Sequence, residues 1–429
     1  MLDTVFKLRD HGTTVRTEIL AGITTFLTMV YIVFVNPSIL QAAGMDQGAV
    51  FVATCLAAAL GTAIMGLYAN YPIALAPGMG LNAYFTYGVV LGMGHSWQVA
   101  LGAVFLSGIL FVILSLLPVR EWIVNSIPRS LKMAISAGIG LFLAIIWLKN
   151  AGIVVDHPAT LVTLGDITAA PALLAALGFL LMVALNARRV PGAIVIAILA
   201  VTAIGVVLGV SPTGGIFSMP PSIAPTFLAM DIWGALEVGL ITIVFAFLFV
   251  DLFDTAGTLV GLAHRGRLLD DQGRLPRLRQ ALLADSVATV GGAAMGTSTT
   301  TSYIESAAGI NAGGRTGLTA VTVAILFALC LFLSPLASTI PAYATAPALL
   351  FVACLMVRGL AEINWDDVTE VAPAVVTAVS MPLTFSIATG IGLGFISYAA
   401  IKILAGRGSE AGVAVMVLSV AFIAKFAII

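Results

Sequence analysis

Charged residues are scarce in this chain. Only 9% of its 429 residues are Asp, Glu, Lys or Arg, whereas a soluble domain carries about 25%. Hydrophobic residues make up 60% of the sequence, more apolar surface than a water-soluble fold of this size can bury. The composition therefore excludes an ordinary soluble enzyme and predicts an integral membrane protein, with the lipid bilayer as its surroundings.

Other features of common functional classes are also missing. The 19 Lys and Arg balance 20 Asp and Glu, so no nucleic-acid partner is expected. The three cysteines lie in apolar runs without CxxC spacing, and the four histidines fall in loops or at span ends, so neither a metal nor a disulfide is expected. No phosphate-binding GxxxxGK[ST] loop is present, which argues against ATP as the energy source for this chain.

About fourteen apolar segments approach the roughly 20 residues that a membrane-spanning helix needs. Their predicted bounds are 18–38, 49–69, 71–90, 98–117, 131–149, 170–187 and 190–210, followed by 232–255, 279–296, 298–312, 316–336, 342–360, 371–403 and 411–428. The segment 371–403 is too long for one straight span and contains Pro382 and three glycines. It is predicted to be either a broken helix or a tight hairpin, which leaves the count at fourteen or fifteen.

Basic residues predict the orientation, because Lys and Arg in short loops stay on the cytoplasmic side. With the N-terminus inside, the inner loops 118–132, 188–189, 261–279 and 313–315 all carry basic residues, whereas the outer loops 150–169, 211–230 and 337–341 carry none. Lys402 and Arg407 are exceptions, since they fall outside if 371–403 is a single span. We expect a multi-pass protein of the plasma or inner membrane, with a cytoplasmic N-terminus and no cleaved signal peptide.

The two halves of the chain follow the same order of features. Each has a span with a polar break, then an ordinary span, then a short interrupted one, and matching features lie about 219 residues apart. Seven spans per half would make this repeat inverted in the membrane. The predicted organisation is an amphipathic N-terminus at 1–15, a first repeat at 16–210, an external loop at 211–230 and a second repeat at 231–429.

Both interrupted segments are rich in residues that do not continue a helix. The first contains Pro72, Pro77, Gly78 and Gly80 close to Asn82, and the second has six consecutive hydroxyl residues from Thr297 to Ser302 before Glu305. Paired broken segments at matching positions are typical of a transporter binding site, since irregular backbone inside a membrane is tolerated only around a cavity.

Four acidic residues stand out within the predicted spans. A charge at the centre of a membrane helix costs about 2.5 to 3.5 kcal/mol on insertion scales, so each needs a reason. Asp251 and Asp254 are three residues apart and are expected to share a helix face, where one of two close carboxylates holds a proton more tightly. They and Glu305 are candidates for proton coupling, whereas Asp285 is expected to cap a helix or to pair with an arginine.

Three motifs resemble the azaguanine-like (AzgA-like) purine permeases, a branch of the nucleobase transporter superfamily. They are Leu75-Ala-Pro-Gly-Met-Gly-Leu-Asn-Ala-Tyr, Val250-Asp-Leu-Phe-Asp-Thr-Ala-Gly and Gly296-Thr-Ser-Thr-Thr-Thr-Ser-Tyr-Ile-Glu-Ser-Ala-Ala-Gly. The resemblance implies an all-α membrane fold with seven plus seven inverted spans. It also implies a core domain from spans 1–4 and 8–11 and a gate domain from spans 5–7 and 12–14, and proton-coupled uptake of adenine, guanine or hypoxanthine by alternating access.

The resemblance also implies which residues contact the substrate. The family's substrate-critical positions match Asn82, Asp251, Asp254 and Glu305 here, and Ser302 and Phe85 complete the predicted binding site. Phe85 or Tyr84 would stack on the purine, although packing explains an aromatic residue at either position equally well. No cofactor is expected beyond the proton gradient, and a homodimer is left open.

Three alternatives remain at this stage. The same architecture also carries sulfate- or bicarbonate-type anions, for which a basic residue would suit the site better than Glu305, and it carries pyrimidines or xanthine. An intramembrane enzyme would need a nucleophile or a metal cluster within a span, and the sequence offers neither.

Overall fold

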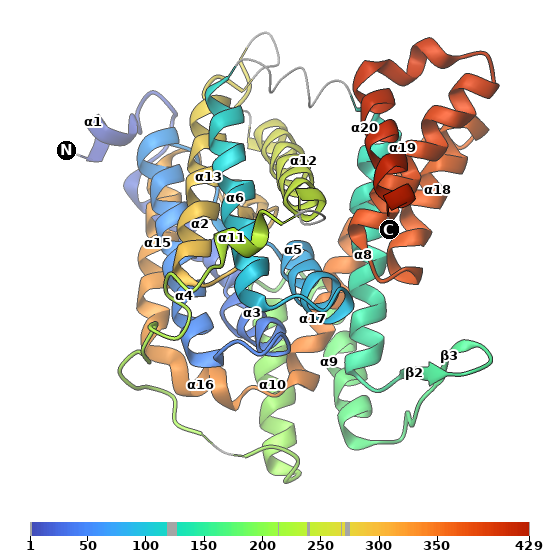
Figure 1. The fold of residues 1–429 in the computed structure, drawn as a ribbon. Helices are drawn as coiled ribbons and strands as arrows, with labels where there is room; N and C mark the ends of the chain where they lie inside the picture. Colours follow the sequence, from blue (N-terminus) through green and yellow to red (C-terminus); the bar gives the residue numbers. More distant parts are fainter. Residues whose placement is uncertain are drawn as a thin grey trace.

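The computed structural model describes residues 2–117, 127–212, 214–237, 241–266, 268–270 and 275–428. This part of the chain is mostly helical, with two small antiparallel strand pairs, β1–β4 and β2–β3 (Figure 1). Nine of its helical segments are long and apolar enough to cross a membrane, and three shorter apolar helices accompany them. The predicted all-α membrane class is therefore confirmed.

The first half begins with a short helix at the N-terminus and contains three strands among its longer helices. Its helices are α1 (Leu2–Phe6), α2 (Val15–Met29), α3 (Ile32–Gln41), α4 (Gln47–Ile64) with a π-helical end at Met65–Ala69, α5 (Met79–Ala83) with the π-helical stretch η2 (Tyr84–Gly92), α6 (Trp97–Leu116), α8 (Arg129–Asn150), α9 (Ala170–Ala187) and α10 (Ala193–Val207). The strands are β1 (Leu75–Pro77), β2 (Val154–His157) and β3 (Leu161–Leu164).

The second half repeats this order and ends with one more helix. Its elements are α11 (Ile232–Ala235), α12 (Ile241–Gly266), α13 (Leu278–Met295), β4 (Thr300–Ser302), α14 (Ser306–Asn311), α15 (Gly317–Leu329), α16 (Ser334–Thr339), α17 (Ala342–Val357), α18 (Val368–Leu383), α19 (Ile387–Leu404) and α20 (Gly408–Ile428), with 3-10 turns at Cys330–Leu333 and Arg358–Glu362. The last helix is kinked at Gly412, where the backbone is not helical.

Two predicted spans need correction. The segment 232–255 is not one helix, because the short α11 is separate and α12 begins only at Ile241; residues 238–240 lie outside the described part. The segment 371–403 is a hairpin of α18 and α19, which was one of the two alternatives, and its turn includes Phe385 with φ at 53°. Parts of the predicted basic loops, 118–126 and 271–274, also lie outside the described residues.

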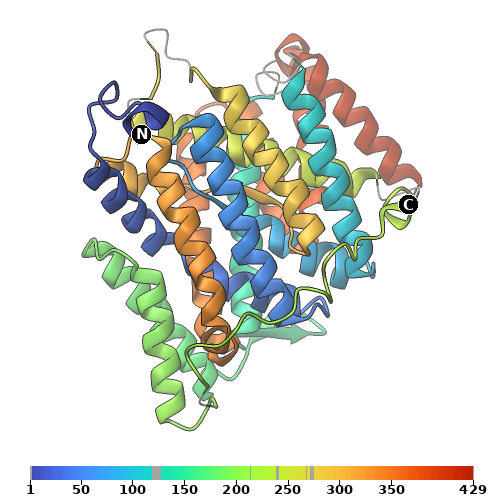
Figure 2. The same ribbon diagram turned by 90° about the vertical axis from the view of Figure 1, so that its left-hand side faces the viewer.

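The helices form two groups. In the first group, α15, α4, α13 and α6 stand side by side in that order, seen as the orange, blue, yellow and teal helices of Figure 2. The same group includes α2 packed on α15, α3 on α4, α14 on α2, and α5 with η2, which packs on α6. In the second group, α8 packs against α17 and α18, α19 lies between α18 and α20, and α9 packs against α10 and α17. Figure 1 shows α18, α19 and α20 on the opposite side of the molecule from α2 and α15.

The inverted repeat is visible where the two halves meet. In each half a strand leads directly into a short helix, β1 into α5 and β4 into α14. The two strands pair antiparallel, so the matching segments run in opposite directions through the centre of the protein. This is the arrangement that an inverted repeat requires.

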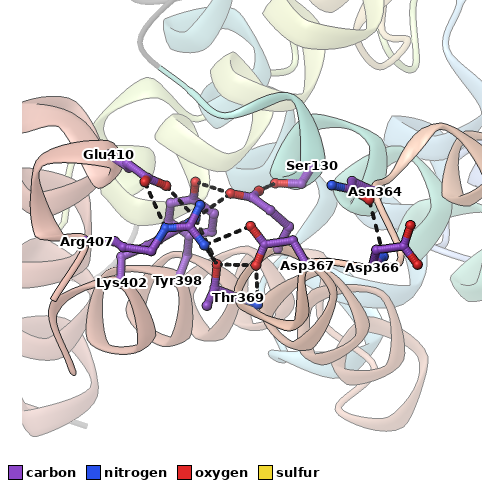
Figure 3. A network of polar contacts seen from close by, with 10 residues as sticks. Ser130, Asn364, Asp366, Asp367, Thr369, Tyr398, Lys402, Arg407 and Glu410 are labelled. Atoms are coloured by element: carbon purple, nitrogen blue, oxygen red, sulfur yellow. Dashed lines mark hydrogen bonds and ion pairs between the residues drawn. The ribbon is translucent and has the colours of Figure 1, made fainter. Parts of the chain in front are cut away.

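The hairpin of α18 and α19 returns Lys402 to the start of α18, where an ionic cluster forms (Figure 3). The Lys402 side chain is fully buried, and its Nζ lies 2.6 Å from Glu370 and 2.9 Å from Glu410. Glu370 also accepts hydrogen bonds from the hydroxyls of Ser130 in α8 and Tyr398 in α19. The cluster therefore joins the ends of four helices, α8, α18, α19 and α20.

A second cation completes this ionic cluster. Arg407 lies 2.9 Å from Asp367 and 2.8 Å from Glu410. Hydrogen bonding from Thr369, followed by that from Arg407, lowers the pKa of Asp367 to about 2, so this carboxyl is charged at neutral pH. Lys402 and Arg407 thus lie at the end of the molecule where α8 begins at Arg129, the end with the other basic loops. Because 371–403 is a hairpin, Lys402 and Arg407 are no longer exceptions to the distribution of basic residues.

Replacing Lys402 with Met is expected to lower the free energy of unfolding by about 3 kcal/mol, because two carboxylates lose a buried cation. The measurement is the melting temperature and equilibrium unfolding of the purified protein in detergent. Lys149→Met is the matched control, since Lys149 is exposed and lies over the ring of Phe385, at 5.7 Å, as a cation–π pair. Equal losses in the two variants would contradict a stabilising role for the cluster.

Candidate functional site

The two broken segments cross and pair at the centre of the protein. Leu75, Ala76 and Pro77 of β1 lie opposite Ser302, Thr301 and Thr300 of β4. The pairing continues at both ends, where the Gly78 amide donates to the Thr299 carbonyl and the Tyr303 amide donates to the Ala74 carbonyl, each at 2.9 Å. Backbone groups that the broken helices leave free are thereby satisfied away from water.

Glu305 lies at this crossing, directly before α14. Its side chain is half-buried, and its Oε1 accepts a hydrogen bond of 2.7 Å from the hydroxyl of Tyr31. Tyr31 is 1% exposed and occupies the break between α2 and α3. Tyr31 is not predictable as a site residue from the sequence, because a tyrosine in an apolar run is an ordinary packing residue unless the neighbouring acid is known.

Asp251 and Asp254, three residues apart on α12, are close enough for their charges to interact, but they differ in exposure. Asp251 is 1% exposed, and its Oδ2 accepts from the Thr289 hydroxyl of α13 at 3.2 Å. Asp254 is exposed, although it lies within a helix long enough to span the membrane, and it is near enough to Glu305 for the two charges to interact. An exposed carboxylate at such a position is expected to face a water-filled space rather than lipid.

Asp285 is a buried member of the same cluster. Its Oδ1 accepts from the hydroxyls of Thr255 at 2.9 Å and Ser302 at 3.1 Å, and its charge interacts with that of Asp251. No arginine is paired with Asp285 in the described part of the chain, and Asp285 instead accepts hydrogen bonds from Ser302 in the second broken segment. Asp251 Oδ1 and Asp285 Oδ2 have no hydrogen-bond partner among these residues.

The remaining predicted site residues are engaged with the protein itself. Asn82 is fully buried in α5; its Oδ1 accepts from the Ser298 hydroxyl, and its Nδ2 donates to the Pro77 carbonyl at 3.4 Å. Ser302 donates its hydroxyl to Asp285. Phe85 is fully buried within the hydrophobic core. The structure therefore gathers the four acids into one cluster, in which Asp254 is near both Glu305 and Asp251. Tyr31 bonds Glu305 and Ser302 bonds Asp285.

The arrangement of strands, half-helices and acids can be compared with known proteins. The Xan_ur_permease family, described as a permease family, matches residues 16–393. The chain belongs to this family. The chain is 50% identical to the adenine permease AdeP of Escherichia coli, over 100% of this chain and 96% of that protein. It is 46% identical to the guanine/hypoxanthine permease PbuG of Bacillus subtilis, over 99% of both.

Among solved structures, the fold is similar to the transmembrane domain of the cyanobacterial bicarbonate transporter BicA. The TM-score is 0.64 with 16% identity, covering 89% of this chain and 97% of that one. This likeness concerns the fold alone. The permease is a multi-pass membrane transporter rather than an enzyme, and the predicted relation to purine permeases is confirmed by the adenine and guanine/hypoxanthine relatives.

Proposed function

We propose that this permease imports purine nucleobases together with protons. The observation that carries the proposal is the half-buried Glu305, held by Tyr31 at the crossing of the two broken spans and close to the exposed Asp254. The names of relatives nearly half identical over the full chain support adenine, guanine or hypoxanthine as the substrate class.

The chemistry of the site suits a purine. A purine has a planar ring whose edge alternates hydrogen-bond donors and acceptors. The Tyr31 hydroxyl bonds one oxygen of Glu305, so the other can accept from ring or exocyclic N–H groups. Asn82, Ser302 and Phe85 remain proposed contacts that require a change in their present bonds or packing when substrate binds.

The proton site is assigned to the buried acids. Asp251 and Asp285 are close enough for their charges to interact, and each has one oxygen without a donor in the described structure. Two ionised carboxylates at this spacing repel each other in a low-dielectric interior, so one proton is expected to be shared between them. Asp254 and Glu305 are more exposed than Asp251 and Asp285, and we propose that they pass this proton to and from the buried pair.

Alternating access is proposed to arise from movement between the two helix groups. The first group, with the broken spans, would form the core domain, and the second, with α8, α9, α10 and α17 to α20, the gate domain. The N-terminus is assigned to the cytoplasm of a plasma or inner membrane because the basic loops and the ionic cluster of Lys402 lie at its end of the molecule. A homodimer is compatible with this scheme but is not needed for it.

Anion transport on the same fold is the competing function. It is disfavoured because acidic residues gather at the crossing, and in the part of the chain that the structure describes no Lys or Arg is hydrogen-bonded or ion-paired to Asp251, Asp254, Asp285 or Glu305. An anion would meet like charge there, which costs several kcal/mol. A neutral nucleobase with N–H donors meets acceptors instead.

The test is uptake of radiolabelled adenine, guanine, hypoxanthine, xanthine, uracil and sulfate by cells that lack their own permeases. We expect uptake of at least one of the first three bases, at a rate that falls when a protonophore is added. Sulfate uptake without purine uptake would overturn the proposal. Purine uptake that is insensitive to the protonophore would remove proton coupling and leave the substrate class intact.

A further inference from the structure

We propose that a cavity between the two helix groups is a second nucleobase site, through which the substrate passes toward Glu305. This inference rests on the proposed function, which supplies the chemistry of the ligand. The cavity has a volume of about 220 Å³ and lies between α3 and η2 of the first group and α8 and α17 of the second. We call it the outer subsite; it is lined by Val35, Ser38, Ile39, Ala42, Tyr87, Asn150, Ala342, Thr345, Ala346 and Leu349.

The outer subsite lies at the end of the molecule away from the N-terminus. Asn150 is the last residue of α8, just before β2, and Ala342 is the first residue of α17. Figure 1 shows β2 and β3 at the lower side of the molecule and the N-terminus near the top. With a cytoplasmic N-terminus, a substrate arriving from outside reaches this cavity before it reaches Glu305.

One face of α3 connects the outer subsite with the central site. Tyr31, which bonds Glu305, is followed by Val35 one turn later, and Val35 donates its amide to the Tyr31 carbonyl at 3.0 Å. Ser38, Ile39 and Ala42 continue the same face toward the end of the helix. Since one helical turn rises about 5.4 Å, the floor of the cavity lies about one turn from the side chain that holds Glu305.

The walls of the outer subsite suit a neutral, planar, hydrogen-bonding ligand. None of the lining residues is charged, so an anion gains no counter-charge there. The polar groups are the Ser38 and Thr345 hydroxyls, the Asn150 carboxamide and the Tyr87 hydroxyl, and these provide both donors and acceptors. The Tyr87 ring and the aliphatic side chains supply apolar surface for the faces of a base.

The polar side chains of the outer subsite also form two hydrogen bonds between the helix groups. Asn150 Nδ2 donates to the Tyr87 hydroxyl at 2.8 Å, and the Thr345 hydroxyl donates to that of Ser38 at 3.4 Å. A base that bonds Tyr87 and Asn150 replaces the stronger of these contacts between the groups. Occupation of the outer subsite therefore exchanges a direct contact between the two helix groups for contacts through the base.

The experiment is site-specific alkylation in the full-length protein with the central site disabled. Ala42→Cys places an exposed thiol on the rim of the outer subsite, and Cys354→Ser removes the exposed native thiol. In a Glu305→Gln background, 1 mM adenine is expected to slow alkylation by an external membrane-impermeant maleimide about fivefold. Adding Tyr87→Phe and Asn150→Ala is expected to abolish this protection, because the base loses its hydrogen-bonding partners.

The control is Tyr343→Phe, which removes a hydroxyl that contacts Ser211. Tyr343 is as buried as Tyr87, but it does not line the cavity. Protection should survive in this control. Protection that requires Glu305, or that persists when both Tyr87 and Asn150 are changed, would overturn the outer subsite while leaving the proposed function standing. Failure of the proposed function is seen separately, as absence of purine uptake by the unmodified protein.

Discussion

Replacing Glu305 with Gln is expected to reduce purine uptake about 100-fold without loss of folded protein. The amide offers one acceptor oxygen in place of two carboxylate oxygens, and that acceptor is already claimed by the Tyr31 hydroxyl. The substrate then meets an N–H₂ donor where its own N–H groups need an acceptor. The loss of a hydrogen bond to a charged group, together with an amide donor that faces the N–H donors of the substrate, costs about 2.7 kcal/mol. This corresponds to a factor of about 100.

The measurement is the initial rate of uptake at several purine concentrations, together with equilibrium binding to the purified protein. Glu362→Gln is the matched control, because Glu362 is exposed and pairs with the exposed Arg129, at 2.5 Å. A surface pair of this kind contributes less than about 1 kcal/mol, so uptake should stay within a few-fold of the unmodified protein. Unchanged kinetics in Glu305→Gln would contradict its assignment to the substrate.

Replacing Asp251 with Asn is expected to abolish concentrative uptake while leaving the protein able to exchange purine across the membrane. Asp251 is buried beside Asp285, and the amide cannot take up or release the shared proton. One proton moving inward across 100 mV supplies about 2.3 kcal/mol, enough for about 50-fold accumulation. That accumulation should fall to equilibration, and the remaining flux should no longer respond to a protonophore.

The readouts are the steady-state ratio of inside to outside purine and the rate of purine counterflow in vesicles. Asp231→Asn controls for the general effect of losing a carboxylate, since Asp231 is exposed and caps the start of α11, where Asn serves nearly as well. Its accumulation ratio should match that of the unmodified protein. Full accumulation by Asp251→Asn would move the proton site elsewhere, and loss of counterflow as well would make Asp251 a substrate residue.

Local rules were sufficient to predict most of the fold. Apolar runs bounded by Pro, Gly or charge gave most of the spans, because a helix that crosses lipid must be apolar along its whole length. The broken segments at Pro77-Gly78 and at Thr297 to Ser302 were predicted for the same reason, since these residues do not sustain a helix. Where the signal was ambiguous, in 371–403, the sequence offered two answers and packing of α18 on α8 and α19 selected the hairpin.

The sequence by itself determined that this chain crosses a membrane, that its two halves repeat the same order of features, and that a few acidic residues lie within the apolar spans. Only the tertiary structure decided their partners. It set Asp285 near Asp251, gave Asp285 two hydroxyl partners, and set Tyr31 against Glu305, 274 positions away. Such contacts depend on how β1 and β4 cross. The position of a residue along its own helix does not reveal which side chain of a neighbouring helix lies opposite it.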